Sequence, residues 1–127
     1  MIKATELRIG NLIYIGGDYE PIYRLGNKRF WSLLGDKVSN KDGFRYKYAQ
    51  PIPITEDWLL KFGFENEGNK KFTISSKSHT YLYSTHSNSF YNIDGFACNI
   101  SDSVIYVHQL QNLYYALTQT ELEISGK

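Results

Sequence analysis

The stretch Val107–Thr118, VHQLQNLYYALT, combines apolar residues at helical spacing with an outer surface that carries no charge. The apolar residues form one stripe, which predicts an amphipathic helix facing the core: Val107, Leu110, Leu113, Tyr114 and Leu117. A second face, at positions i, i+3, i+4 and i+7, consists of His108, Gln111, Asn112 and Tyr115. No Asp, Glu, Lys or Arg occurs between Ser103 and Thr120, although a water-facing helix normally carries some charge for solubility.

Two interpretations of this uncharged face are open. The helix can be packed on both sides within one domain, with its amides satisfied by neighbouring backbone. Alternatively, His108, Gln111, Asn112 and Tyr115 form a face that contacts a second copy of the chain or a ligand. We favour the second interpretation and therefore expect a homo-oligomer.

The preceding segment AQPIPITEDWLLKFGFE, residues 49–65, predicts a short helix from Glu56 to Phe62. Its two prolines favour an extended approach to the helix. The segment carries the capping signals of a complete short helix: Thr55 as N-cap, Glu56 and Asp57 in the first turn, Ile54 and Leu59 as a hydrophobic staple, and Gly63 as a left-handed C-terminal cap with Phe64 folding back on Leu59.

The remainder of the chain is rich in strand patterns. Leu12–Ile15, the turn signal at residues 16–18 and the segment from Pro21 to Leu25 predict a strand pair. Residues 44–48 alternate aromatic and basic side chains, as a half-buried strand with a basic outer side does. Residues 29–36, RFWSLLGD, are ambiguous between a strand and one helical turn, and residues 70–85 read as a hairpin with a Ser/Lys loop.

Asp94-Gly95 is a strong two-residue turn signal within FYNIDGFACNI, residues 90–100. Pairing around this turn sets Ile93 opposite Phe96 and Tyr91 opposite Cys98, which places Cys98 in a core layer. After the helix, ELEI predicts a last short strand with Leu122 and Ile124 inward. The fold class is therefore α+β: a β-rich N-terminal half with a small curled sheet, a short capped helix, an antiparallel meander, a C-terminal helix and a final strand.

The 127 residues are the size of one domain, residues 1–127, and the prolines near residues 49–54 mark a candidate subdomain joint. No apolar run approaches the ~20 residues of a membrane span, and no leader pattern follows Met1, so we expect neither membrane insertion nor secretion. Cys98 is the single cysteine, which excludes an internal disulfide and a thiolate metal cluster within one chain. These features favour the cytoplasm.

The net charge of +1 predicts no polyanion partner by itself, but residues 21–50 contain seven basic and two acidic residues, a local net charge of +5. Basic residues stand beside aromatic ones there, as a phosphate-bearing, ring-containing ligand requires. The alternative is a purely structural strand, with one aromatic side that packs on the core and one side in solvent. The candidate ligand-binding residues are Arg24, Arg29, Trp31, Arg45, Lys47 and Tyr48.

The sequence carries no catalytic signature, so we expect no enzyme activity and no cofactor. His79 and His86 lie seven residues apart in a strand-like region, and residues 68–93 contain no carboxylate to complete a metal site, so we interpret both as surface histidines. Cys98 is interpreted as a small core residue rather than a nucleophile. Gly16-Gly17 lacks the helix and lysine that a phosphate loop needs.

Three blocks of the chain resemble a group of small uncharacterised proteins associated with phages and prophages of Bacteroidota. The blocks are ELRIGN (residues 6–11), PIPITEDWLLKFGFE (residues 51–65) and YVHQLQNLYYALTQTELEI (residues 106–124). One departure is Gln119, which stands where the pattern has Gly after LT and puts a left-handed helix cap there in doubt. The resemblance implies a mobile-element protein that acts in a bacterial cytoplasm, and it implies no particular chemistry.

The leading hypothesis is a non-enzymatic phage accessory protein that binds a small anionic ligand, such as a nucleotide signal of host anti-phage defence. A nucleic-acid-binding module and a protein-interaction factor are the alternatives. The modest net charge favours a small ligand over nucleic acid, because duplex-binding proteins usually carry a larger basic excess.

Overall fold

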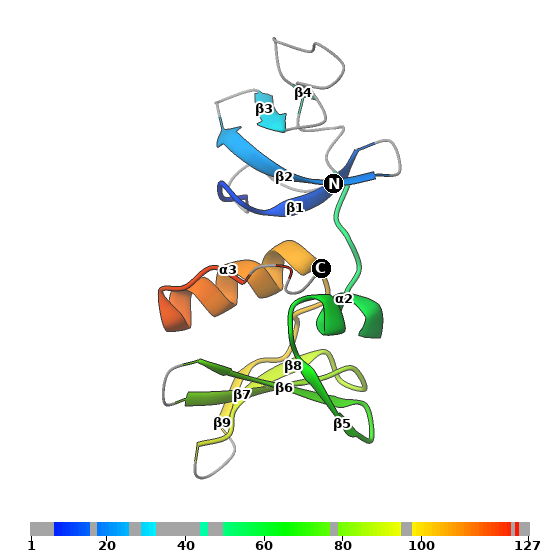
Figure 1. Cartoon of the computed structure of the whole chain (residues 1–127), viewed down its shortest axis with the longest axis vertical. Coiled ribbons are helices and arrows are strands. Elements are labelled where there is room, and N and C mark those ends of the chain that lie inside the picture. Colours follow the sequence, from blue (N-terminus) through cyan, green and yellow to red (C-terminus); the bar gives the residue numbers. More distant parts are fainter. Residues whose placement is uncertain are drawn as a thin grey trace.

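The computed structural model describes residues 7–15, 18–25, 29–32, 44–45, 50–76, 79–94, 98–122 and 124, and for 15, 18–20, 23–25, 29–32 and 44–45 it describes the backbone only. It has the expected α+β fold, arranged in layers: a small N-terminal sheet, two helices and a five-stranded sheet (Figure 1). Neither helix of the described residues is long and apolar enough to cross a membrane.

The N-terminal sheet contains four antiparallel strands in the order of the chain: β1 (Leu12–Ile15), β2 (Asp18–Leu25), β3 (Arg29–Ser32) and β4 (Phe44–Arg45). The expected strand pair is confirmed, although the return strand begins at Asp18 rather than near Pro21. The ambiguous segment RFWS is a strand, because it pairs with β2 on one side and β4 on the other. Residues 46–48 of the expected alternating strand lie outside the described residues.

Residues 50–54 connect the two sheets as an extended segment. Gln50 bridges to Tyr14 of β1 through two backbone hydrogen bonds of 3.0 Å, and Pro53 bridges to Tyr106 before the C-terminal helix. The buried Ile52 accepts a hydrogen bond from Val107 N–H at 2.8 Å. The predicted joint is therefore a segment tied to both parts of the molecule.

Helix α2 (Glu56–Lys61) has the predicted caps at both ends. Thr55 Oγ1 accepts a hydrogen bond from Trp58 N–H at 3.3 Å. Gly63 has φ +92°, and the N–H groups of Gly63 and Phe64 donate to carbonyls of the last turn at 3.0 Å each, which completes a Schellman cap. The helix ends one residue earlier than expected.

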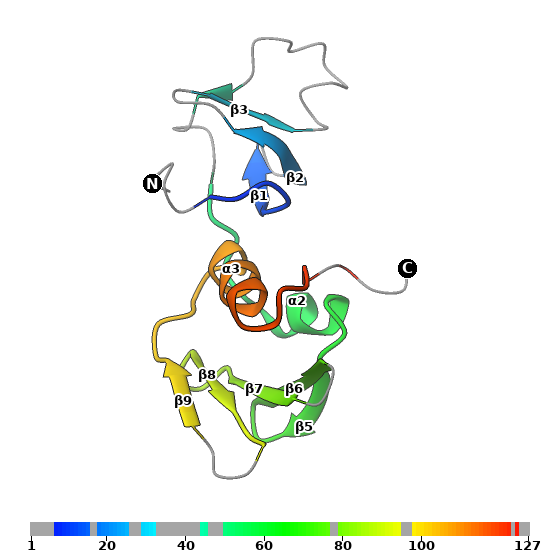
Figure 2. The same cartoon turned by 90° about the vertical axis from the view of Figure 1, so that its left-hand side faces the viewer.

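The five-stranded sheet is an antiparallel meander of consecutive strands: β5 (Glu65–Gly68), β6 (Lys71–Ser76), β7 (His79–Ser84), β8 (Ser89–Asn92) and β9 (Cys98–Ser101). Helices α2 and α3 (Val107–Thr118) lie on one of its faces, and α3 lies between the two sheets (Figures 1 and 2). The buried core fills the space between this face and the helices, and it includes Ile52, Leu59, Phe62, Phe72, Tyr81, Tyr83, Phe90, Val107, Leu110 and Tyr114.

The expected inward position of Cys98 is wrong. The hairpin forms, but Cys98 pairs with Asn92 and Asn99 pairs with Tyr91, one residue out of the predicted register. A one-residue slip transfers each side chain to the other face of a strand, and Cys98 is accordingly exposed. The turn signal therefore identified the hairpin correctly but not the length of its connection.

The C-terminal helix spans the predicted residues Val107–Thr118. It ends with Gln119 in the left-handed conformation, φ +61°, and the Gln119 N–H donates to Tyr115 O at 2.8 Å, so the cap forms without glycine. No strand follows among residues 120–122 and 124. Leu122 is buried as expected, whereas Ile124 is 41% exposed, so its predicted inward position is wrong.

Candidate functional site

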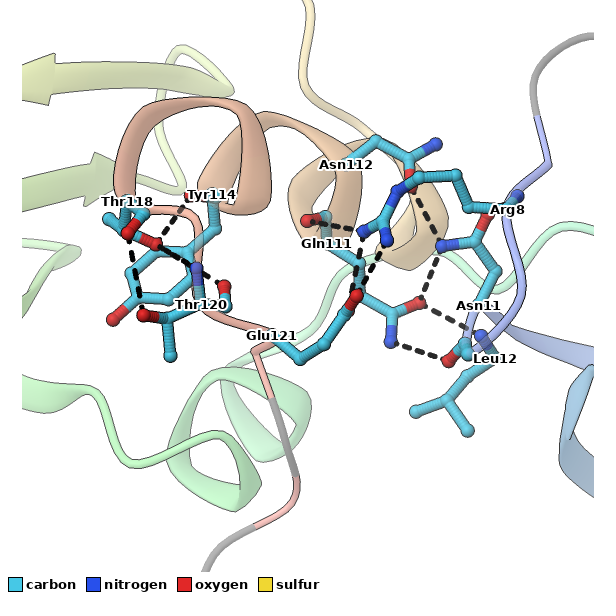
Figure 3. A network of polar contacts seen from close by, with 10 residues as sticks. Arg8, Asn11, Leu12, Gln111, Asn112, Tyr114, Thr118, Thr120 and Glu121 are labelled. Atoms are coloured by element: carbon cyan, nitrogen blue, oxygen red, sulfur yellow. Dashed lines mark hydrogen bonds and ion pairs between the residues drawn. The ribbon is translucent and has the colours of Figure 1, made fainter.

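The uncharged face of α3 contacts the N-terminal segment of the same chain. Gln111, 2% exposed, binds this segment through both ends of its carboxamide. Its Oε1 accepts a hydrogen bond from Leu12 N–H at 2.8 Å, and its Nε2 donates to Gly10 O at 3.1 Å (Figure 3). Gln111 thus satisfies two backbone groups at the entrance of β1.

Arg8 extends the same network to the end of the chain. Its Nε donates to Asn112 Oδ1 at 2.9 Å, and its Nη1 forms an ion pair with Glu121 Oε2 at 2.6 Å (Figure 3). The guanidinium carbon lies 4.5 Å from the centre of the Tyr115 ring, at cation–π distance. Asn11 Nδ2 also donates to Asn112 Oδ1, at 2.8 Å. Arg8 is therefore bound by side chains of its own chain.

The contacts of Gln111 and Asn112 correspond to the first interpretation of the uncharged helix, the one not favoured from sequence. Their carboxamides bind within the chain, where we had expected a second copy or a ligand. The physical reason is that the buried N–H and C=O groups at the entrance of β1 need partners, and amides supply both a donor and an acceptor without a buried charge. Self-association of the protein stays a prediction.

Two of the three quoted sequence blocks meet at this junction. Arg8, Gly10 and Asn11 belong to ELRIGN, and their partners Gln111, Asn112, Tyr115 and Glu121 belong to the C-terminal block. Gly10 has φ +98°, a conformation that favours glycine. Sequence reasoning missed Arg8 and Glu121, and the co-occurrence of the two blocks was the signal that could have identified them. Residues of these two blocks thus join the two parts of the fold.

His108 lies on the same helix but away from this network. It is 1% exposed, and its ring stacks on Tyr106 with 6.0 Å between centroids and 10° between planes. A cavity of about 550 Å³ borders it, lined by Ser101, Ser103, Val104, His108, Gln109, Asn112 and Leu113. The four predicted face residues are thus divided: Gln111 and Tyr115 contact the N-terminal segment, His108 lines the cavity, and Asn112 does both.

A second cavity, of about 410 Å³, lies where the two parts join, lined by Gly10, Leu12, Pro21, Gln111, Glu121, Leu122 and Ile124. Gln111 and Glu121, the polar side chains among these residues, are bound to Leu12 N–H and Gly10 O and to Arg8. The other residues that line this cavity would therefore offer a ligand a mainly apolar surface.

The predicted anion site falls on strands β2 to β4. Their register pairs Arg24 with Trp31 and Arg29 with Arg45. Directly opposed residues of an antiparallel pair share one face of a sheet. Four of the six candidate residues therefore occupy two opposed pairs on adjoining strands, while Lys47 and Tyr48 lie outside the described residues.

The histidines outside the helix are exposed, as expected. His79 Nδ1 lies 2.6 Å from Asp94 Oδ2, and Thr80 N–H donates to Asp94 Oδ1 at 2.7 Å. These contacts, led by the His79 hydrogen bond, hold the pKa of Asp94 below its ordinary value. Asp94 directly follows residues 68–93, which contain no carboxylate, so the sequence argument did not include it as a partner of His79. No group of metal-ligating side chains occurs among the described residues.

The carboxylates at the start of α2 and on β5 do not form a reactive cluster with one another in the described part of the chain. Glu56 and Asp57 lie in the first turn of α2, as expected from capping. Glu65 and Glu67 are exposed on β5, where Glu67 Oε2 accepts a hydrogen bond from Thr73 at 2.7 Å. Comparison with protein-family models, curated proteins and solved structures finds no match for this chain.

Proposed function

We propose that this chain is a non-enzymatic accessory protein of a phage or related mobile element, and that it binds a small anionic, nucleotide-like ligand on strands β2 to β4. The observation that carries the proposal is the pairing of Arg29 with Arg45. Like charges at directly opposed positions of an antiparallel pair are destabilising. An anion bound between the two positions would remove this repulsion and explain why both residues are arginine.

Two further observations support this location. Trp31 stands opposite Arg24 on the adjoining strand pair, so an aromatic position accompanies the basic ones, as a base-bearing phosphate compound requires. Arg8, the basic residue at the junction, is already bound to Glu121 and Asn112. The basic charge of the sequence is concentrated in residues 21–50, where the local net charge is +5.

Calorimetry with mono-, di- and cyclic nucleotides, beside a short DNA duplex, tests the proposal. Replacing both Arg29 and Arg45 by alanine should abolish binding of the nucleotide while the protein stays folded. The matched control is the double change Lys70→Ala and Lys71→Ala, which removes the same charge from two exposed residues, one in the turn before β6 and one at the start of β6.

The outcome also separates the alternatives. Affinity that increases with oligonucleotide length and falls steeply with salt would favour the nucleic-acid-binding module. Absence of binding to every nucleotide and to DNA would reject the anion site and favour a protein-interaction factor. The assignment to a mobile element is supported by the sequence blocks, and it is tested separately by detecting the protein in cells during phage production.

A further inference from the structure

A small cavity lies at the C-terminal end of α3, which Figure 1 shows over the end of the sheet where β6 ends and β7 begins. Its volume is about 260 Å³, and it is lined by Ser76, His79, Tyr81, Leu117, Thr118 and Gln119. The buried Tyr81 and Thr118 form its inner wall. The cavity is smaller than the ~300–1,000 Å³ of sites for drug-sized ligands, so it suits a ligand of a few heavy atoms.

The hydroxyl of Tyr81 is the first feature that points to a ligand. Tyr81 is 3% exposed, and its ring packs on Phe90 and Tyr114, with centroid distances of 5.4 and 6.3 Å. The hydroxyl has no hydrogen-bond partner among the described residues, although buried polar groups of proteins nearly always have one. Burial and the nearby Asp94 carboxylate raise the pKa of Tyr81 above its ordinary value, so the group stays a neutral hydroxyl. A ligand in the cavity would supply the missing partner.

His79 contributes a second hydrogen-bonding atom to the same cavity. Its Nδ1 lies 2.6 Å from Asp94 Oδ2, and its ring centroid lies 6.4 Å from that of Tyr81. The His79 contact holds the pKa of Asp94 below its ordinary value, so Asp94 is an ionised carboxylate that can only accept. The proton therefore lies on Nδ1, and Nε2 of the neutral ring is an acceptor. Nothing in the described part of the chain bonds to Nε2.

The rim of the cavity adds two polar side chains and one apolar one. Within the described ranges, neither Ser76 Oγ nor the Gln119 carboxamide makes a hydrogen bond. Leu117, 39% exposed, supplies apolar surface. Thr118 Oγ1 is already engaged, because it donates to Tyr114 O at 2.8 Å and accepts from Thr120 N–H at 3.1 Å. The groups that remain for a ligand are thus His79 Nε2, the Tyr81 hydroxyl and the two rim side chains.

The electrostatic surroundings of the cavity favour a cation. The C-terminal end of a helix carries partial negative charge, and the last turn of α3 contains no basic residue to balance it. Asp94 adds a full negative charge beside His79 and Tyr81. No Lys or Arg occurs among the described residues that line the cavity. A matching ligand is therefore small and positively charged, and it donates hydrogen bonds.

We propose that this cavity binds the ammonium group of a small aliphatic amine. An ammonium group has three donors and no acceptor, so it can donate to His79 Nε2, to the Tyr81 oxygen and to the Gln119 carbonyl oxygen. The alkyl chain packs on Leu117. This site is separate from the anion site proposed on β2 to β4 and prefers the opposite charge.

The experiment is an NMR titration of the full chain with three probes of equal chain length: butylammonium, 1-butanol and butyrate. The backbone amides of Thr80 and Gln119 are followed at constant ionic strength and about pH 8, above the range in which histidine side chains usually change charge. Saturable shifts are expected with butylammonium alone, with a dissociation constant on the order of 1–10 mM for a ligand of this size. Equal shifts with 1-butanol or butyrate, or no shift with butylammonium at about 50 mM, would overturn the proposal.

Tyr81→Phe removes the hydroxyl and keeps the ring contacts with Phe90 and Tyr114. Butylammonium should bind about fivefold more weakly, while the melting temperature stays the same or rises, because a buried hydroxyl without a partner does not stabilise the fold. A hydroxyl with a purely structural role would give the reverse, a lower melting temperature with unchanged affinity. Tyr91→Phe is the matched control, since Tyr91 follows the inward Phe90 and lies on the other face of β8.

Asp94→Asn tests the charge. The change keeps an oxygen that can accept from Thr80 N–H, and it removes the negative charge beside the cavity, so butylammonium should bind about tenfold more weakly. Asp57→Asn makes the same change at an exposed position of α2 and should bind as the wild type does. Wild-type affinity in Tyr81→Phe or Asp94→Asn would contradict the proposal. The double alanine variant at Arg29 and Arg45 should bind butylammonium normally, so the failure of one proposed site is distinguishable from the failure of the other.

Discussion

Gln111→Met is the most direct test of how the two parts of the protein are joined. Methionine has a similar length and is apolar, so the change removes the hydrogen bonds of Gln111 with Leu12 N–H and Gly10 O, and a longer one from Asn11 Nδ2 at 3.5 Å, without creating a large cavity. Leu12 N–H and Gly10 O then lose their partner in a place where Gln111 itself is 2% exposed. Each unsatisfied buried group costs about 1–3 kcal/mol, so the expected loss is about 4 kcal/mol in the free energy of unfolding.

A loss of this size is a large part of the ~5–15 kcal/mol that stabilises an ordinary domain. Urea unfolding followed by tryptophan fluorescence measures it as a lower midpoint. Hydrogen exchange at the Leu12 amide supplies a local measurement, because this N–H donates to the residue that is replaced. Ala116→Met, at an exposed position of the same helix, is the matched control and should change the stability by less than about 0.5 kcal/mol.

The reasoning would be refuted if Gln111→Met cost less than about 1 kcal/mol and left Leu12 exchange unchanged, because water or another group would then satisfy both backbone atoms. Sedimentation of the same variant distinguishes the junction from a self-association face. If Gln111 bound a second copy, the change would lower the oligomeric mass while the stability of each chain stayed the same.

Three further outcomes are expected. Thr55→Ala should lower stability by ~1 kcal/mol through loss of the N-terminal cap of α2, visible as a lower urea midpoint. Gln119→Gly should raise the melting temperature, since glycine adopts φ +61° without the ~1 kcal/mol cost of a left-handed residue with a side chain; an unchanged or lower value would contradict this. The pKa of Asp94 lies below its ordinary value of 3.8, so its ionised form contributes stability above that pH, and this contribution is lost as the pH falls through the folded-state pKa. Asp94→Asn should reduce the fall in melting temperature that the wild type shows below pH 3.8. An NMR titration that gave the Asp94 carboxyl a pKa of 3.8 or higher would contradict this prediction.

Local signals were sufficient for the elements whose determinants lie within a few residues of one another. The caps of α2 depend on Thr55 and Gly63, each acting within one helical turn, and both formed as predicted. The apolar spacing of residues 107–118 likewise predicted α3 from end to end, because one buried face suffices to specify a helix of this length. The α+β class followed from these two helices and the strand patterns around them.

The local sequence signals did not predict the register of the strands. The Asp94-Gly95 signal predicted a hairpin, but a connection longer than two residues pairs Cys98 with Asn92 instead of Tyr91, and Cys98 is exposed. The pairing of Arg29 with Arg45 also depends on a strand register, here across a connection of more than ten residues. Side-chain alternation has a period of two, so a shift of one residue reverses every such prediction.

The sequence by itself determined the two helices, the single cysteine and the concentration of basic charge in residues 21–50. Only the tertiary structure decided what the uncharged face of α3 contacts, because the partners of Gln111 and Asn112 lie about a hundred residues away, at Arg8, Asn11 and Leu12. Gln and Asn residues recur at the same helical spacing whether their side-chain amides are buried against a partner or exposed to solvent, so the sequence pattern does not distinguish the two cases. The physical difference is whether backbone groups in need of a hydrogen-bond partner lie next to the amide. For Gln111 these groups are Leu12 N–H and Gly10 O, and they lie there only when the chain is folded with β1 beside the helix.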